Sequence, residues 1–124
     1  MKLTQVTLPE MRAEVISAVR ALSDPEYQQR VWIDRIYPKP NFFDDFTLNV
    51  NILNDATVLD APEAALGYTL ASDAEVRAMS ALANALDSAL KTVGRDASDA
   101  EFMASEPWPG VVAAARDALT ALTE

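Results

Sequence analysis

The sequence predicts an all-α protein, a compact single-domain bundle of about five to seven helices over residues 1–124. Two observations favour this fold class. Apolar residues recur at steps of three and four in several segments, which is the spacing of one helix face. Helix-start signals precede these same segments, and a chain of 124 residues has the size of one hydrophobic core.

The longest predicted helix extends from Ser72 to Gly94. Ser72 and Glu75 form a capping box, in which each side chain can bond the backbone N–H of the other residue, and Gly94 is a usual helix stop. One face carries the apolar stripe Val76, Met79, Ala83, Leu86, Leu90 and Val93. At 1.5 Å per residue such a helix is about 30 Å long, so it spans a small domain.

Shorter helices are expected on both sides of it. Pairs in which Ser, Thr or Asp precedes Glu by three residues mark further starts: Thr7 and Glu10, Ser23 and Glu26, Asp60 and Glu63, and Ser98 and Glu101. The corresponding helices are expected to end near Ser23, Tyr37, Gly67 and Met103, and a last helix to run from about Pro107 to Leu122. Residues 1–6 are expected to be a frayed lead-in.

Residues 45–53 fit two local structures. The alternation of apolar and polar residues over 46–52 is typical of a half-buried strand. Apolar residues over 43–53 also fit one face of a helix, with Asp44 or Asp45 as its cap. Because few other segments could pair with a strand, we favour the helix. A small β-hairpin near residues 46–59 is the alternative.

Two residue types that carry much enzyme chemistry are missing. The chain has no cysteine and no histidine. It therefore lacks disulfides, thiolate nucleophiles, the usual general base near neutral pH and the common zinc ligand sets. The composition favours a protein that is not an enzyme, and neither a cofactor nor a metal is expected.

Negative charge is concentrated in the middle of the chain. The net charge is −9, and no basic residue lies between Lys39 and Arg77, a stretch that holds seven of the 19 acidic residues. Nucleic-acid binding needs clustered Lys and Arg, so a nucleic-acid partner is not expected. An acidic face instead steers a basic partner towards it, although it can also serve only to keep the protein soluble.

One polar cluster contains the residue types of a metal or catalytic site. Its oxygen-bearing side chains suit calcium or magnesium: Asp44, Asp45, Asn49, Asn51, Asn54 and Asp55. Their order does not match a calcium loop, because it contains no turn glycine and no closing glutamate. An acid–base pair of Asp44 and Asp45 is disfavoured too, since neighbouring residues on a helix diverge by about 100°. Helix caps, turns and a partner surface are the preferred interpretations.

Aromatic residues lie beside this cluster. Phe42 and Phe43 follow the proline-containing residues 37–40 on a predicted loop and precede the Asp44-Asp45 pair. An aromatic anchor with an acidic rim is typical of a binding surface for a basic protein. The alternative is that one phenylalanine faces the core and the other is partly covered.

Several motifs occur in a fixed order: Leu8-Pro9-Glu10-Met11, Asp24-Pro25-Glu26-Tyr27-Gln28 leading to Trp32, Phe43-Asp44-Asp45, Asn54-Asp55-Ala56-Thr57, Gly67, and Trp108 before a helix. Over residues 8–122 this order resembles a family of small acidic bacterial proteins similar to the immunity proteins of contact-dependent growth inhibition and polymorphic toxin systems. Members often carry a histidine and an Asp-Asp pair where this chain has Asn51 and Asn54-Asp55. No site is carried over at those positions.

The resemblance implies an inhibitor that binds a cognate toxin domain, commonly a nuclease, and blocks it by steric and electrostatic occlusion without catalysis. The base-free stretch is compatible with this role, because an acidic surface competes with nucleic acid for a basic nuclease. We place six residues at the partner surface: Phe42, Asp44, Asp45, Asp55, Asp60 and Glu63.

The alternative function is a self-associating helical scaffold or adaptor, with the stripe over residues 76–93, or an apolar face left over after folding, as the dimer seam. A monomer is favoured over a homodimer. No run approaches the roughly 18 apolar residues of a membrane span, and the N-terminus lacks the apolar stretch of a secretory signal. We therefore expect a cytoplasmic protein that does not bind membranes.

Overall fold

The computed structural model describes residue 3 and residues 5–124, and over these residues the protein is all-α, as predicted. Its elements are α1 (Pro9–Leu22), α2 (Pro25–Tyr27), the π-helical segment η1 (Gln28–Ile33), α3 (Phe46–Asp55), the 3₁₀ segment η2 (Pro62–Ala65), α4 (Asp73–Val93), α5 (Asp99–Met103) and α6 (Trp108–Thr123). Within the described residues the only β-type pairing is an isolated bridge between Leu66 and Leu70. The helical alternative for residues 45–53 is thus confirmed and the hairpin alternative is wrong.

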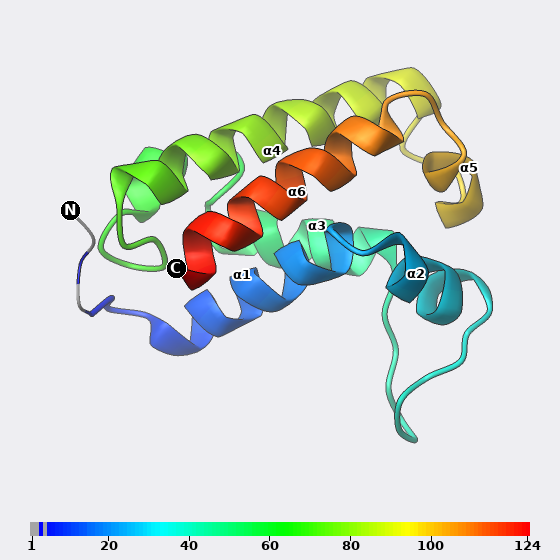
Figure 1. The fold of residues 1–124 in the computed structure, drawn as a ribbon, viewed down its shortest axis with the longest axis horizontal. Coiled ribbons are helices and arrows are strands. Elements are labelled where there is room, and N and C mark those ends of the chain that lie inside the picture. Colours follow the sequence, from blue (N-terminus) through cyan, green and yellow to red (C-terminus); the bar gives the residue numbers. More distant parts are fainter. Residues whose placement is uncertain (1–2, 4) are drawn as a thin grey trace.

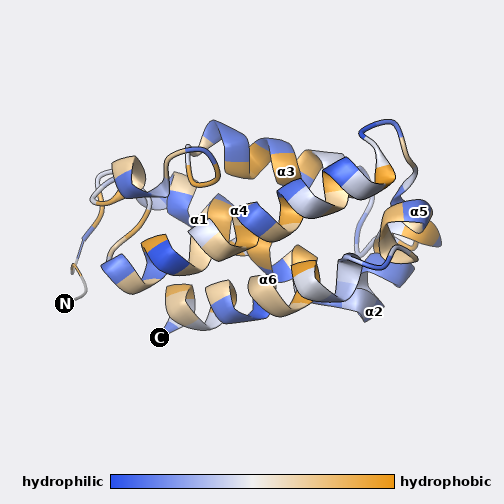
Figure 2. Cartoon of the chain, turned by 90° about the horizontal axis from the view of Figure 1, so that it is seen from above, coloured by the Kyte–Doolittle hydropathy of each residue, from blue (hydrophilic) through white to orange (hydrophobic). Residues whose placement is uncertain are grey.

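The four long helices pack side by side. Helix α6 packs against both α4 and α1, and α1 packs against α3 (Figure 1). The first turn of α1 and the last turn of α6 lie at one end of the bundle. Segment η1, α5 and the loop of residues 34–45 lie at the other end (Figures 1 and 2). The protein therefore has two distinct ends joined by a common core.

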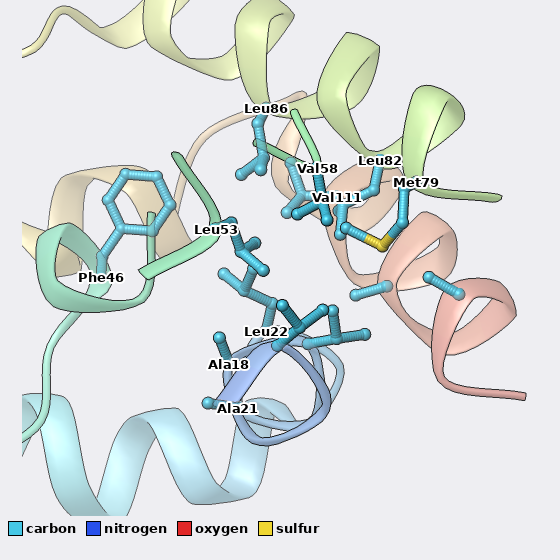
Figure 3. Packing of buried hydrophobic residues seen from close by; sticks show 14 of the residues in the cluster. Ala18, Ala21, Leu22, Phe46, Leu53, Val58, Met79, Leu82, Leu86 and Val111 are labelled. Atoms are coloured by element: carbon cyan, nitrogen blue, oxygen red, sulfur yellow. The ribbon is translucent and has the colours of Figure 1, made fainter. Parts of the chain in front are cut away.

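The core lies between these helices. Side chains from α1, α3, α4 and α6 converge in the interior, among them Leu22, Leu53, Leu86 and Val111, each at most 2% exposed (Figure 3). Burying a side chain of this size contributes about 1.5–3 kcal/mol. Along each long helix, hydrophobic residues alternate with hydrophilic ones (Figure 2), as expected for helices with one face in the core.

The buried face of α4 is rotated from the predicted stripe. Met79 and Leu86 are buried as predicted, but the other centres of the buried face are Leu82 and Ala89, together with Glu75. The remaining predicted positions, Val76, Ala83, Leu90 and Val93, are half-buried at its flank. The cause is that α4 packs mainly along one neighbour, α6, and small alanines allow close approach there.

Proline decides three of the helix starts. Helix α1, α2 and η2 begin at Pro9, Pro25 and Pro62, and none uses the predicted Ser, Thr or Asp pair. A proline at the first helical position makes the residue before it the cap. That residue is Leu8 for α1 and Ala61 for η2, which make no side-chain cap, whereas Asp24 accepts the Tyr27 N–H at 3.1 Å.

The predicted caps of two other helices are confirmed. Ser72 and Ser98 accept the N–H groups of Glu75 and Glu101, both at 3.2 Å. Only the second pair forms the full reciprocal box, because Glu101 also accepts the Ser98 N–H. Helix α3 begins after Asp45, whose carboxylate accepts the Leu48 N–H at 2.7 Å.

The second predicted helix is shorter than expected. It was expected to reach about Tyr37, but η1 ends at Ile33. The Asp34 N–H bonds the Gln29 carbonyl five residues back, and Arg35 then takes a left-handed φ of 57°. A non-glycine residue in that region is uncommon and ends a helix, so the chain turns before the prolines.

A buried ion pair joins three helices at the α1 start. Glu75 is 0% exposed and receives two bonds from the Arg12 guanidinium, at 2.6 and 3.1 Å, as well as the Ala71 N–H at 2.9 Å. Arg12 also donates to the carbonyls of Thr69 and Leu122. One guanidinium therefore ties α1 to α4, to the turn before α4 and to the end of α6.

The N-terminal segment is anchored where it is described. The N–H groups of Leu3, Thr7 and Leu8 donate to the carbonyls of Ala71, Gly67 and Tyr68, at 2.6, 2.8 and 2.9 Å. The expectation of a frayed lead-in is therefore wrong for residue 3. For residues 1, 2 and 4 that expectation lies outside the described residues.

Candidate docking site at the 34–45 loop

The loop of residues 34–45 extends away from the helices at one end of the bundle (Figure 1). Its backbone is fixed at two left-handed residues, Arg35 and Asn41, with φ values of 57° and 63°. Two of the most exposed large apolar side chains of the described chain lie on it, Ile36 at 60% and Phe43 at 55%. Exposed aromatic and aliphatic groups on a projecting loop are typical of a contact surface.

Asp44 anchors the end of this loop to the core. It is only 8% exposed, and its carboxylate accepts bonds from the Tyr27 hydroxyl, the Trp32 indole N–H and the Asn49 amide, at 2.8, 2.8 and 2.9 Å. These donors are neutral side chains from three elements. Because both carboxylate oxygens are used inside the protein, Asp44 has a structural role.

Segment η1 is held in place by a second buried polar group. Gln28 is 0% exposed, and its amide N–H group donates to the carbonyls of Ala21 and Leu22 at 2.9 and 3.0 Å. Its carbonyl oxygen accepts the Trp108 indole N–H at 3.1 Å. The end of α1, η1 and the start of α6 are thereby locked together, which fixes the backbone that carries Trp32.

Aromatic rings form the floor of the loop end. Trp32 packs against both Phe46 and Trp108, with ring centroids 6.3 Å from each, while Phe46 and Trp108 are 5.4 Å apart and Phe46 packs on Phe102 at 4.5 Å. On the outer side Tyr37 packs on Phe42 and Phe43, with centroids 5.9 and 6.4 Å away. The loop is thus supported by edge-to-face and tilted ring contacts, the geometry that aromatic pairs prefer.

A hollow of about 350 Å³ opens between this loop and the start of α5. We call it the aromatic–acidic hollow, and its lining is Trp32, Ile33, Arg35, Tyr37, Phe43, Asp44, Asp45, Ser98, Asp99 and Ala100. Three aromatic rings and three carboxyl groups therefore face one space, with one arginine at its edge. A second hollow, of about 390 Å³, lies on the other side of Phe43 and Asp44.

Asp99 is the acid that the electrostatics of the hollow affect most. Partial burial raises its pKa, and the neighbouring carboxylates of Asp45 and Asp44 raise it further, whereas the Phe46 N–H that it accepts at 3.3 Å and the Arg35 guanidinium lower it in part. Burial, with the hydrogen bond to Asp44 and its charge, also raises the pKa of Tyr27. Negative charge in the hollow is therefore only partly compensated from within the chain.

The six predicted partner residues fall into two places. Asp44 is buried, Phe42 is half-buried against the core, and Asp45 is the half-buried cap of α3. Asp55 is the last residue of the same helix, so at 1.5 Å per residue it lies about 15 Å from Asp45 along the axis.

The other two predicted residues, like Asp55, do not line the hollow. Asp60 and Glu63 are exposed, and Asp60 lines a groove of about 480 Å³ between α3 and α4, together with Asp87 and Arg95. The structure thus brings only Asp44 and Asp45 into the aromatic–acidic hollow. The six residues therefore do not line one hollow, and their role at a partner surface stays a prediction.

Most residues of the hollow were not among the predicted partner residues, which supply only Asp44 and Asp45. Asp99 is distant in sequence from Asp45, whereas Arg35 belongs to the same loop and Trp32 contributes an indole ring from η1. The sequence did carry one signal for Asp99, because the Ser98-to-Glu101 capping box places it at the start of a helix. Nothing in the sequence indicates that this helix start packs beside the start of α3.

The hollow offers binding groups. Among the described residues, no group of three or more His, Cys, Asp or Glu side chains is gathered so as to hold a metal ion. The ionisable lining consists of carboxyl groups, one tyrosine and one arginine. The rings and carboxylates suit recognition of a cationic group through stacking and charge, and the one guanidinium opposes it.

The fold and the site together define a small all-α protein with an acidic, aromatic-walled hollow at one end. Residues 6–124 match the family described as "Domain of unknown function (DUF7945)", and the chain belongs to that family. No curated protein and no solved structure matches the chain. None of the described helices has both the length and the apolar composition needed to cross a bilayer.

Proposed function

We propose that this protein is a non-catalytic immunity protein that binds a cognate basic toxin domain, with a nuclease as the expected target, and covers its working surface. The observation that carries the proposal is the aromatic–acidic hollow on a projecting loop. It combines an aromatic anchor, Phe43 at 55% exposure, with the acidic side chains of Asp45 and Asp99. Interface anchors are typically aromatic residues at a surface of complementary charge.

The charge of the chain supports the same role. A nuclease is basic where it grips phosphate, and a protein with a net charge of −9 is drawn to such a surface. Bound there, it would compete with nucleic acid by occupying the same basic groups. The partner is accordingly a protein and not a nucleic acid, and the proposed place of action is the cytoplasm, with the inhibitor as a monomer.

The exposed acids at the far end of α3 form a second part of the proposal. Asp55, Asp60 and Glu63 are exposed and belong to residues 40–76, a stretch of the sequence without Lys or Arg. They would add long-range attraction without being the anchor. Contacts of this kind change the rate of association more than the lifetime of a complex.

Co-expression with the toxin domain encoded by a neighbouring reading frame tests the proposal. We expect the two chains to elute together in gel filtration, growth of the cells to be restored, and binding to weaken as salt rises from about 50 to about 500 mM because exposed charges are screened. Absence of a complex at the low salt concentration, together with unrelieved growth arrest, would contradict the proposal.

The second candidate function is self-association at an apolar face left over after folding. The stripe over residues 76–93 cannot be the seam, because its central residues are buried against α6 within the chain. An apolar patch remains at the α1 end, where Leu8 at 41%, Leu66 at 38% and Tyr68 at 54% are exposed. Leu8 and Tyr68 are adjacent there through a backbone hydrogen bond of 2.9 Å.

Sedimentation separates the two functions. A scaffold should form dimers at micromolar concentration. The Tyr68→Ser variant should then be monomeric, since a stable dimer interface needs a large buried apolar area. A monomer at all concentrations would remove this candidate and leave the inhibitor.

A further inference from the structure

We propose that the aromatic–acidic hollow receives one arginine side chain of a partner protein, with its guanidinium between the aromatic walls and the carboxylates of Asp45 and Asp99. This inference rests on the proposed function, because it names the group by which the basic partner is held. It concerns a single side chain and not the whole interface. The argument depends on the walls, the charge and the size of the hollow.

The walls fit a flat cation. Trp32, Tyr37 and Phe43 line the hollow, and a guanidinium stacks on an aromatic face more readily than a compact ammonium does. The chain already uses this contact beside the hollow, where the Arg30 guanidinium lies 5.8 Å from the centroid of the Tyr27 ring. Arginine is therefore a better occupant than lysine.

The charge fits a single cation. Asp45 and Asp99 line the hollow from the starts of two different helices, and Asp99 accepts the N–H of Phe46, the residue that follows Asp45. Among the described residues, no Lys or Arg nitrogen lies within 4.0 Å of the carboxylate of Asp45 or Asp99. Two carboxylates that share a space can each bond one edge of a guanidinium.

Arg35 lies at the edge of the same hollow and sets a limit to its charge. Its guanidinium offsets only part of three carboxyl groups. A further cation is still attracted, but less strongly than if Arg35 were absent. Removing this arginine should therefore tighten binding of a second one.

The size of the hollow is compatible with one side chain. Its volume of about 350 Å³ falls at the lower end of the roughly 300–1,000 Å³ found for small-ligand pockets. A folded segment would not fit. A side chain that projects from a partner would fill the hollow and allow Phe43 and Ile36 to contact the surface around it.

The test uses the peptide acetyl-Gly-Arg-Gly-amide and its neutral citrulline counterpart, added to the ¹⁵N-labelled full chain. We expect millimolar binding of the arginine peptide, seen as shifts of the Trp32 indole and Phe46 amide signals, and at least about tenfold weaker binding of citrulline. The lysine peptide should bind several-fold more weakly than arginine. Equal binding of arginine and citrulline, or shifts confined to other surfaces, would overturn the inference.

A matched pair of variants locates the site. Asp45→Asn with Asp99→Asn keeps the cap and the oxygen that accepts the Phe46 N–H, removes two charges, and should weaken arginine-peptide binding about tenfold. Asp55→Asn with Asp60→Asn removes the same charge elsewhere and should change it less than about twofold. The reverse result would refute the inference.

Two further variants do not depend on the acidic pair. Phe43→Ala alters an exposed ring, so folding is retained, and we expect about threefold weaker binding. Arg35→Gln should tighten binding by about twofold or more, and weaker binding would contradict the placement of the cation.

The outcomes distinguish this inference from the proposed function. If the toxin complex forms but the peptide does not bind, the hollow is refuted and the function stands on the acids at the other end of α3. If the peptide binds at the hollow while no toxin complex forms, the site stands and the function fails.

Discussion

The two ends of the bundle each bury a carboxylate, and they compensate it in different ways. At the α1 end, Glu75 is held by the Arg12 guanidinium, so a fully buried carboxylate meets a half-buried cation. At the loop end, Asp44 is held by a hydroxyl, an indole N–H and an amide, all neutral. The first arrangement ties helices together, and the second supports a loop beside a hollow.

This difference indicates which end of the bundle tolerates substitution of its buried carboxylate without loss of the fold. A paired buried charge makes both partners indispensable, because removing one leaves the other in a low-dielectric interior. A carboxylate held by neutral donors can be replaced by an amide at a smaller cost. The loop end is therefore the more adaptable one.

Arg12→Met should have the largest effect. It removes the guanidinium that compensates Glu75, which is 0% exposed, and should lower the free energy of unfolding by about 3–5 kcal/mol in urea denaturation. As a control, Asp87→Asn breaks the exposed pair with Lys91 and should cost less than about 0.5 kcal/mol. Adding Glu75→Leu to Arg12→Met should recover most of the loss, and no recovery would argue against charge burial as the cause.

Asp44→Asn should have an intermediate effect. The amide NH₂ group of the new asparagine would face one of the three hydrogen-bond donors that the carboxylate now accepts. We therefore expect the free energy of unfolding to fall by about 1–3 kcal/mol in urea denaturation. Because burial and Asp44 together raise the pKa of Tyr27, the substitution should also lower that pKa towards its ordinary value. Carbon-13 NMR of labelled Tyr27 follows this titration, and an unchanged pKa would contradict the assigned cause.

The raised pKa of Tyr27 makes the free energy of unfolding fall at high pH. A raised pKa in the fold means that the unfolded chain releases the phenol proton first, so this group costs stability as pH rises beyond about 10. In Asp44→Asn the pH at which the phenol ionises in the folded chain should be lower. The decline in the free energy of unfolding with rising pH should therefore stop at a lower pH in the variant than in the wild type.

Thr69→Val should raise stability at the α1 end. The Thr69 hydroxyl is buried and has no hydrogen-bond partner in the described part of the chain, while its carbonyl accepts from Arg12. Replacing the hydroxyl by a methyl group of similar size should increase the free energy of unfolding by about 1 kcal/mol. Thr69→Ser, which keeps the hydroxyl, should give no gain, and an equal gain would point to another cause.

Asp99→Asn should have the smallest effect, and one that depends on pH. A raised pKa means that ionisation is disfavoured in the fold, so the wild type loses stability relative to the variant as pH rises through the carboxyl range. The difference in thermal midpoint should be larger at about pH 7 than at about pH 3, and equivalent to less than about 0.5 kcal/mol because the site is partly solvated. A difference that grows towards low pH would show the opposite shift.

Local signals in the sequence predicted most of the fold. The helical repeat of α4, in which Met79 and Leu86 are buried as predicted, and the caps at Asp45, Ser72 and Ser98 each depend on residues within a few positions of one another. Where two local signals competed, the proline at the first helical position decided the start and the Ser-to-Glu pair did not. The early end of η1 followed from a left-handed Arg35, which no local rule required.

The site was less predictable, because its contacts are between distant residues. The Phe46 N–H and Asp99 are 53 positions apart, and Gln28 and Trp108, which hold η1 beneath the site, are 80 apart. Asp44 was predicted to be at the partner surface because it belongs to the acidic stretch without basic residues, but it is buried by donors that lie on α2, η1 and α3. Whether an acid faces solvent depends on the packing of other elements, and the local pattern does not contain that information.

The π-helical turn of Gln28–Ile33 makes the chain sensitive to length at that point. An α-helix rotates by about 100° per residue, and the wider turn lets Gln28 reach Trp108 while Trp32 reaches Asp44. Deleting one residue between them would turn one of these side chains away from its partner. The neighbouring loop can lose or gain a residue more easily, so spacing within this turn, as much as amino-acid identity, keeps the two indoles in register.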